Sequence, residues 1–398
     1  MWIRSVNGCW RAGIRWQTGV MGLAPDNFVL VPALKSAVLN PNTISLAMKK
    51  IDFITGLRGY SAFGVFLIHA GGMGLREYSR FTNGLVDLGR LGVISFFVLS
   101  AFTICMSIDK DRFSFKDYML KRCLRILPLY YVAILVGTYL GGAEYYRNMF
   151  HTTPGYSLLS HMTFANIFDY RYQNDILGVE WTIPVEFFYY FLIPIVFFTS
   201  KGRPALMLIY LLAAGALSIN ILTYFSQIYH RDYIDIIYTL SFQRYAFCFA
   251  FGIFLYSIRN TIPKSKLNGL AILALILVLL NYVYIDLTYQ AFFVTFWVGV
   301  LVLFCLPGSW VSKILFENKI IVFLGEISYS LYLTHAIVLA LVFKHFDNSV
   351  PFQFLALAIT IAVSTFTYFA IEKPFINLGK RLTTKPVAAS PATTEPVS

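Results

Sequence analysis

Two polar residues stand in a stretch that is otherwise apolar enough to cross a bilayer. Arg58 and His69 lie eleven positions apart in IDFITGLRGYSAFGVFLIHAGG, Ile51–Gly72. At about 3.6 residues per turn, both side chains leave the same helix face, roughly 16 Å apart along the axis. Such groups persist in hydrocarbon mainly where they face a bundle interior or a wet cavity, so the shared face favours a functional channel. For either residue alone, a snorkelling arginine and a histidine bonded to a carbonyl remain alternatives.

Other ionisable residues fall within predicted spans: Glu186, Arg244, Glu326 and His335. Glu186 follows Pro184 in EWTIPVEFFYY, so we expect a helix that begins at the proline, with the carboxylate in its first turn near the positive dipole end. A functional role for Glu186 is an equal alternative. We interpret His335, in SYSLYLTH, as a hydrogen-bonded packing element.

Arg122 and Arg125 precede the third predicted span in KDRFSFKDYMLKRCLRILPLYY. Residues three apart share a helix face, and two guanidinium groups there can bind a phosphate or pyrophosphate. A phosphorylated cytoplasmic cofactor and anionic lipid headgroups are equally good ligands. The five cysteines lack metal-like spacing, so we predict neither a disulfide framework nor a metal site.

The composition excludes an ordinary soluble domain. Of 398 residues 58% are hydrophobic and 13% charged, and the mean hydropathy is +0.65, as in polytopic membrane proteins. In a soluble protein a net charge of +12 would suggest nucleic acid. Here topology explains the basic residues, and we predict lipid as a partner and no nucleic acid.

We predict an all-α transmembrane bundle of about ten spans, each long enough for a bilayer core. The predicted inner segments carry roughly three times as many Lys and Arg as the outer loops, which places both termini in the cytoplasm. The expected spans are 53–72, 91–108, 124–141, 180–198, 204–225, 238–257, 267–285, 289–306, 320–343 and 352–371.

The two ends differ from the membrane domain, 48–376. Residues 1–47 carry arginines and short apolar pieces, which faintly resembles a transit peptide. We favour a true start at Met48, followed by two lysines. Residues 377–398 are small, polar and proline-bearing, so we expect a disordered cytoplasmic tail. The longest outer loop, 142–179, is rich in aromatic and polar residues that suit a sugar, or that anchor the bundle at the interface.

Several of these stretches together resemble the acyltransferase 3 family of integral-membrane acyltransferases, from residue 51 to about 376. The pattern departs from the family at Ala101, where a glycine is usual, which affects helix packing more than chemistry. The matching stretches are Asp52 with Leu57-Arg58-Gly59 and His69, GRLGVISFFVLSAF, Arg122 and Arg125 with Pro128 and Tyr130, WTIPVEFFYY, LGEISYSLYLTH, and Ile371-Glu372-Lys373-Pro374.

The resemblance implies transfer of an acyl group, commonly acetyl from cytoplasmic acetyl-CoA, to a hydroxyl of an extracytoplasmic glycan or lipid-linked saccharide, such as O-antigen or exopolysaccharide. It implies that His69 takes the acceptor proton, that Arg58 holds the donor phosphates or pantetheine, and that Arg122 and Arg125 bind the nucleotide. Glu186 would orient or recharge the histidine. The acyl-CoA is a co-substrate, we expect no tightly bound cofactor, and the location is the inner cell membrane.

Three alternatives stay open at this point. Buried Arg, His and Glu in a multi-span bundle also suit a proton-coupled transporter or a flippase for a lipid-linked sugar. Within the enzyme class, the acyl group and the acceptor are not fixed by the sequence. We favour direct transfer over an acyl-enzyme, because no cysteine or serine has an obvious activating partner.

Overall fold

The computed structural model describes residues 41–110, 112–228, 231–261, 270–274, 276, 287–305 and 309–383. In these ranges every regular element is a helix and no strand occurs, which confirms the all-α class. The described residues from Ser45 onwards form one compact unit. Helix α1 already includes the last residues of the predicted leader, and α17 the first residues of the predicted tail. Residues 1–40 and 384–398, which make up the rest of these two segments, lie outside the described residues.

The helices follow one another through short connections, and the predicted outer loop holds two of them, α6 and α7. In the first half the elements are α1 Pro41–His69, α2 Leu75–Tyr78, α3 Arg80–Asp87, η1 Leu88–Arg90, α4 Leu91–Ile108, α5 Phe115–Tyr139, α6 Glu144–Phe150, α7 Pro154–Thr163, η2 Ala165–Phe168 and η3 Tyr170–Tyr172. In the second half they are α8 Thr182–Ser200, α9 Pro204–Ile228, α10 Arg231–Leu240, η4 Phe242–Tyr245, α11 Ala246–Ile258, α13 Leu287–Cys305, η6 Ser312–Phe316, α14 Lys319–Glu326, α15 Ser328–His345, α16 Val350–Thr367, η7 Tyr368–Glu372 and α17 Lys373–Thr383.

Four helical stretches in the described part of the chain are long and apolar enough to cross a membrane, or up to six if each of two bent pairs counts as one span. One bent pair is α14 with α15, which meet at 73° where a single predicted span runs from 320 to 343. The predicted span 238–257 is divided among α10, η4 and α11. The predicted span 267–285 falls mostly outside the described residues.

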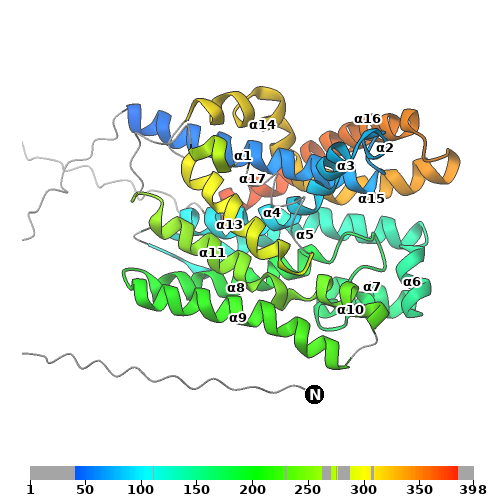
Figure 1. Cartoon of the computed structure of the whole chain (residues 1–398), viewed down its shortest axis with the longest axis horizontal. Helices are drawn as coiled ribbons and strands as arrows, with labels where there is room; N and C mark the ends of the chain where they lie inside the picture. Colours follow the sequence, from blue (N-terminus) through cyan, green and yellow to red (C-terminus); the bar gives the residue numbers. More distant parts are fainter. Residues whose placement is uncertain are drawn as a thin grey trace, which may run out of the picture. The chain divides into compact units, whose positions relative to one another are not determined.

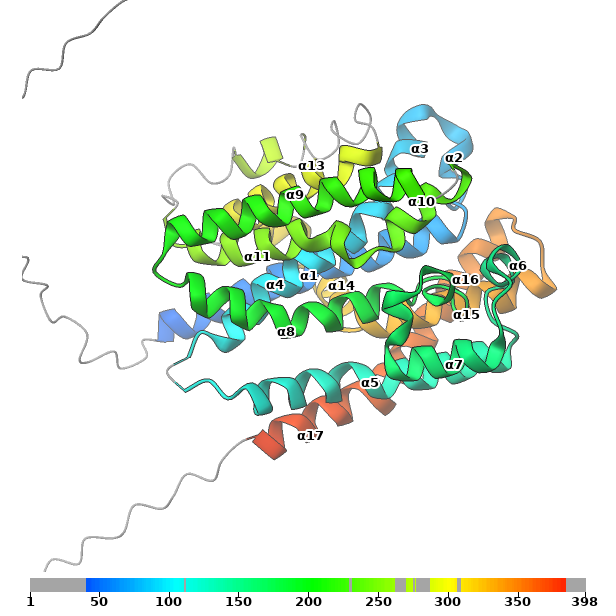
Figure 2. The same ribbon diagram turned by 90° about the horizontal axis from the view of Figure 1, so that it is seen from below.

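The helices pack through small residues at their closest approaches. Figure 1 shows α15 beside α16, and Figure 2 shows α5 beside α17, in agreement with their contacts. Helix α4 packs on α11, where a Cβ added to Gly252 would lie 2.7 Å from the Cβ of Ala101. The alanine that replaces the usual family glycine is therefore accommodated by a glycine on the facing helix.

Glycines also fix the position of α1. A Cβ added to Gly59 would clash with the backbone of α14, and one added to Gly325 would clash with the Thr55 carbonyl. Because backbones approach so closely only where side chains are absent, these two glycines hold the α1 segment that carries Arg58 against α14.

Candidate active site

Three cavities contain the side chains singled out in the sequence. The basic cavity, of about 350 Å³, is lined by residues of α4, α5 and α17. The Arg58 cavity, of about 40 Å³, lies among residues of α1, α4, α8 and α15. The His69 cavity, of about 500 Å³, is lined by α1, the start of α4, the segment before α8, and α10 with η4.

Cationic side chains dominate the basic cavity. Arg122 and Arg125, predicted to share a helix face, both line it, together with Lys110, Arg112, Lys121 and Lys380; one carboxylate, Asp117, is also present. Arg122 donates to the Ser107 hydroxyl at 3.3 Å and lies over the rings of Tyr118 and Tyr190. Neither arginine forms an ion pair within the described residues. The cavity therefore offers unneutralised positive charge to an anion.

The Arg58 cavity holds a guanidinium group that is poorly satisfied. The Nε atom of Arg58 is buried and has no hydrogen-bond partner among the residues described, and its Cζ lies 5.7 Å from the centre of the Phe96 ring. Glu186 lines the same cavity but forms no ion pair with Arg58 within 4.0 Å. A buried donor without an acceptor is costly, so Arg58 is suited to bind an oxygen of a ligand.

Glu186 differs from its prediction in two ways. Helix α8 begins at Thr182 rather than at Pro184, because a proline without an N–H is tolerated throughout a first helical turn. The carboxylate accepts a hydrogen bond from the Ser100 hydroxyl at 2.5 Å. Glu186 therefore has a hydrogen bond to a serine of α4, and the hydrogen bond from Nδ1 of His69 goes to another residue.

His69 is the last residue of α1, and its exposed side chain lines the His69 cavity. Aromatic, amide and hydroxyl groups surround it, with two arginines. The polar and aromatic lining consists of Arg90, Tyr146, Asn174, Trp181, Thr239, Arg244, Tyr245 and Tyr332. Arg244 donates to the Thr239 hydroxyl at 2.8 Å and lies over the Tyr238 ring.

The three cavities differ in whether they share lining residues. Val93 and Tyr332 line both the Arg58 and the His69 cavity, so the two cavities adjoin at these side chains. The basic cavity shares no lining residue with the Arg58 cavity. The charges of Arg125 and Glu186 nevertheless act on Arg58. The basic cavity is thus near Arg58 but not open to it.

The hydrogen-bond partner of His69 is a second histidine. Nδ1 of His69 lies 2.9 Å from Nε2 of His335, and the rings are stacked with an interplanar angle of 7°. Nδ1 of His335 lies 3.2 Å from the Leu331 carbonyl oxygen. A carbonyl only accepts, so His335 donates through Nδ1, accepts from His69 through Nε2, and leaves Nε2 of His69 unprotonated.

The sequence interpretation of His335 as a packing element is therefore incomplete. The residue is fully buried and hydrogen-bonded as expected, but it also fixes the tautomer of His69. No periodicity connects positions 266 residues apart. The signal available was that each histidine is the last residue of a stretch that resembles the family, LRGYSAFGVFLIH and LGEISYSLYLTH.

Comparison with known proteins relates the chain to acyltransferases. The family model described as an acyltransferase domain matches residues 51–369. A Staphylococcus aureus (strain COL) protein named as a candidate O-acetyltransferase is 25% identical over 365 residues, which cover 83% of this chain and 58% of that protein. A candidate acetyltransferase of Acidianus two-tailed virus is 29% identical over 296 residues, 71% of this chain and 81% of the viral protein. No solved structure matches significantly.

Proposed function

The chain belongs to the acyltransferase 3 family, and we propose that it moves an acyl group, in the simplest case acetyl, from acyl-CoA to a hydroxyl of an extracytoplasmic glycan. The observation that carries the proposal is a histidine with an unprotonated nitrogen in a large cavity, on the same helix as a buried arginine whose Nε has no hydrogen-bond partner among the described residues. The S. aureus relative is longer than the matched region, so its name supports the class of reaction only.

The basic cavity is the proposed site for the nucleotide end of the donor. Coenzyme A carries phosphate groups, and Arg122 and Arg125 present two guanidinium forks to the same 350 Å³ space. Lys121 and Lys380 add further charge. The pantetheine arm would then pass between α5 and α8 towards Arg58, which requires side chains between the two cavities to move.

Arg58 is the proposed binding group for the pantetheine arm of the donor, whose amide carbonyls can accept a hydrogen bond from the buried Nε–H. Because Arg58 and His69 are roughly 16 Å apart along α1, the thioester itself would lie nearer to His69. Glu186, held by Ser100, balances the charge of Arg58 before the donor arrives. Glu186 is therefore a positioning residue in this scheme.

His69 is the proposed general base. Its Nε2 takes the proton of the acceptor hydroxyl, the oxygen bonds to the thioester carbon, and the C–S bond breaks as the tetrahedral intermediate collapses. The proton then passes from His69 to the leaving thiolate. None of the four described cysteines lines any of the three cavities, which supports direct transfer.

The His69 cavity is the proposed acceptor site. Trp181, Tyr245 and Tyr332 offer apolar faces, and Asn174 and Thr239 offer polar groups, which together suit a glycan or a lipid-linked saccharide. This arrangement fits a protein of the cell membrane with about ten spans and both termini in the cytoplasm. The donor side is then cytoplasmic and the acceptor side extracytoplasmic.

The test is acetyl-CoA-dependent labelling of a panel of glycans by the protein purified in detergent. We expect labelled ester and released thiol from the wild type and from His345→Ala, a variant at an exposed histidine on α15. We expect neither product from His69→Ala at an unchanged melting temperature. Full activity of His69→Ala would overturn the assignment.

A further inference from the structure

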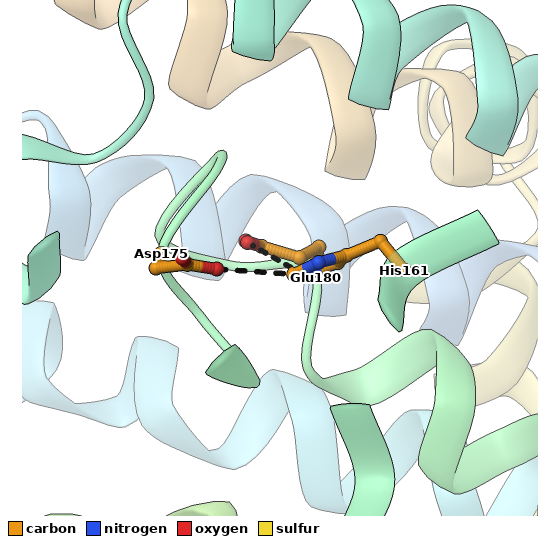
Figure 3. Close-up of side chains that lie close together, drawn as sticks. All are labelled: His161, Asp175 and Glu180. Carbon is orange, nitrogen blue, oxygen red and sulfur yellow. Dashed lines mark ion pairs between the residues drawn. The ribbon is translucent and has the colours of Figure 1, made fainter. Parts of the chain in front are cut away.

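A second histidine cluster lies apart from the three cavities. His161 of α7 faces Asp175 and Glu180 of the segment before α8, as Figure 3 shows. All three side chains are fully buried, although carboxylates are rarely buried without a cation. Nε2 of His161 lies 3.3 Å from Oε1 of Glu180 and 3.9 Å from Oδ1 of Asp175.

The hydrogen bonds of this cluster turn the imidazole lone pair towards the carboxylates. Nδ1 of His161 lies 2.8 Å from the Ser157 carbonyl oxygen, so Nδ1 donates and the neutral ring carries its lone pair on Nε2. Both oxygens of Glu180 accept backbone N–H groups, from Ile176 and Val179. The lone pair on Nε2 and the two negatively charged carboxylates thus face one another. They repel unless a positive charge lies between them.

Unsatisfied atoms gather at the same point. Both carboxylate oxygens of Asp175 and Nε2 of His161 are buried without a hydrogen bond in the described part of the chain, as is the Tyr130 hydroxyl, which interacts electrostatically with both carboxylates. The hydroxyls of Ser157 and Thr152 lie close enough to contribute weak hydrogen bonds to Asp175. A fully buried carboxylate with no well-formed hydrogen bond to either oxygen among the described residues indicates a missing ligand.

We propose that His161, Asp175 and Glu180 bind one divalent transition-metal ion of the Zn²⁺ class. Two ligands each ~2.1 Å from a tetrahedral ion are separated by ~3.4 Å, close to the 3.3 Å from His161 to Glu180, and Asp175, 3.9 Å from His161, would move inwards on binding. The three ligand atoms all lie within 4.8 Å of one another. An imidazole with two carboxylates suits Zn²⁺ better than Mg²⁺ or Ca²⁺, and the Ser157 carbonyl orients the imidazole as in known metal sites.

The ion would stabilise the position of one wall of the His69 cavity. Asp175 and Glu180 flank a short turn whose Gly178 and Val179 line that cavity. The turn is also held by Tyr332, whose hydroxyl donates to the Val179 carbonyl at 2.7 Å. Crosslinking this turn to α7 by a metal keeps the acceptor wall in place, so metal removal should weaken acceptor binding more than donor binding.

A proton is the competing occupant. Burial opposes an imidazolium, but the hydrogen bond to Glu180 and the charges of Glu180 and Asp175 favour it and raise the pKa of His161. A protonated His161 would form a buried ion pair with the carboxylates and leave no room for a metal. The two occupants differ in metal content, which can be measured without an activity assay.

The experiment measures zinc in the full chain, purified in detergent with a tag that contains no histidine. We expect about one zinc ion per chain in the wild type and a loss of most of it in His161→Gln and in Asp175→Asn. The control is His151→Asn, which alters an exposed histidine of the same outer segment and suits its positive φ of 51°. It should keep the metal.

A melting curve of the wild type keeps the proposal testable if a variant fails to fold. A chelator should lower the melting temperature, and Zn²⁺ alone should restore it, because a ligand bound to the folded state stabilises that state. Wild-type protein that contains no more zinc than His161→Gln and that melts identically with chelator and with Zn²⁺ would overturn the proposal in favour of the ion pair. Restoration by Ca²⁺ but not by Zn²⁺ would overturn the metal class.

Discussion

The basic cavity and the His69 cavity are similar in size and opposite in chemistry. The first, of about 350 Å³, is lined by arginines and lysines of α5, α17 and the segment between α4 and α5. The second, of about 500 Å³, is lined by aliphatic and aromatic side chains, one amide, one threonine hydroxyl and two arginines around one imidazole. The difference supports the proposal that the protein binds a polyanion at the first site and a polyhydroxylated acceptor at the second.

The largest effect is expected at Arg58, on the proposed donor path. Arg58→Met should lower kcat/KM for acetyl-CoA by about 10²-fold, the cost of losing a charged hydrogen bond to the pantetheine arm. Because Arg58 does not line the His69 cavity, the acceptor KM should change little. Steady-state kinetics with each substrate varied in turn measures this, with Arg58→Lys as the variant that keeps the charge. An unchanged kcat/KM for acetyl-CoA in Arg58→Met would remove Arg58 from the donor path.

The second-largest effect is expected at the proposed donor site, the basic cavity. Replacing Arg122 and Arg125 together by alanine should raise the KM for acetyl-CoA by about 10- to 100-fold, the loss of one or two charged hydrogen bonds, and leave the acceptor KM unchanged. Lys116→Ala is the matched control, because Lys116 lies on α5 but does not line the basic cavity. An equal rise in both KM values would mean that the cavities do not divide the substrates.

The acceptor side should show the reverse pattern. Trp181 lines the His69 cavity and packs on Tyr245. Trp181→Ala should raise the acceptor KM by about three- to tenfold, as expected for one aromatic contact, with the acetyl-CoA KM unchanged. Tryptophan fluorescence and the melting temperature test whether the variant folds. A change confined to the acetyl-CoA KM would contradict the assignment of this cavity.

The smallest effect concerns stability away from both cavities. Lys201 donates to Asp109 at 2.6 Å and the Tyr256 hydroxyl donates to the same carboxylate at 2.8 Å. The hydrogen bond from Lys201, against the opposing effect of burial, lowers the pKa of Asp109. Asp109 therefore stabilises the fold above its unfolded pKa of about 3.9, and this contribution is lost as the pH falls through its lower folded value.

The comparison for this prediction is Asp109→Asn. At neutral pH the variant should be less stable by less than about 1 kcal/mol, since the Lys201 partner is half exposed. Below pH 4 the two melting temperatures should converge. A constant difference across the acid range would show that the carboxylate charge does not contribute.

The helical class of the bundle could be predicted from the sequence, because hydropathy reports burial in lipid directly, whereas the described part of the chain gives four to six candidate spans. The predicted span 91–108 coincides with α4. The bend between α14 and α15 could not be predicted from a helix-breaking residue. It lies at Glu326 and Ile327, where the sequence has no proline, and the neighbouring Gly325 is in close contact with α1.

The candidate site could likewise be predicted only in part. Residues near one another in sequence, such as Arg122 and Arg125, were correctly expected to share a surface. Contacts between distant helices were missed: the partner of His69 is His335 rather than Glu186, and His161 meets Asp175 and Glu180 across a loop without regular spacing. Such pairs depend on how helices pack, which local patterns do not encode.

The central claim is that the donor reacts from the basic cavity while the acceptor enters through the His69 cavity. The most direct test uses sealed proteoliposomes of one orientation, with labelled acetyl-CoA only on the side of Arg122 and a glycan acceptor only on the side of His69. We predict labelled glycan on the acceptor side, and none when the compartments are exchanged. Labelling only when both substrates share one compartment would contradict the account.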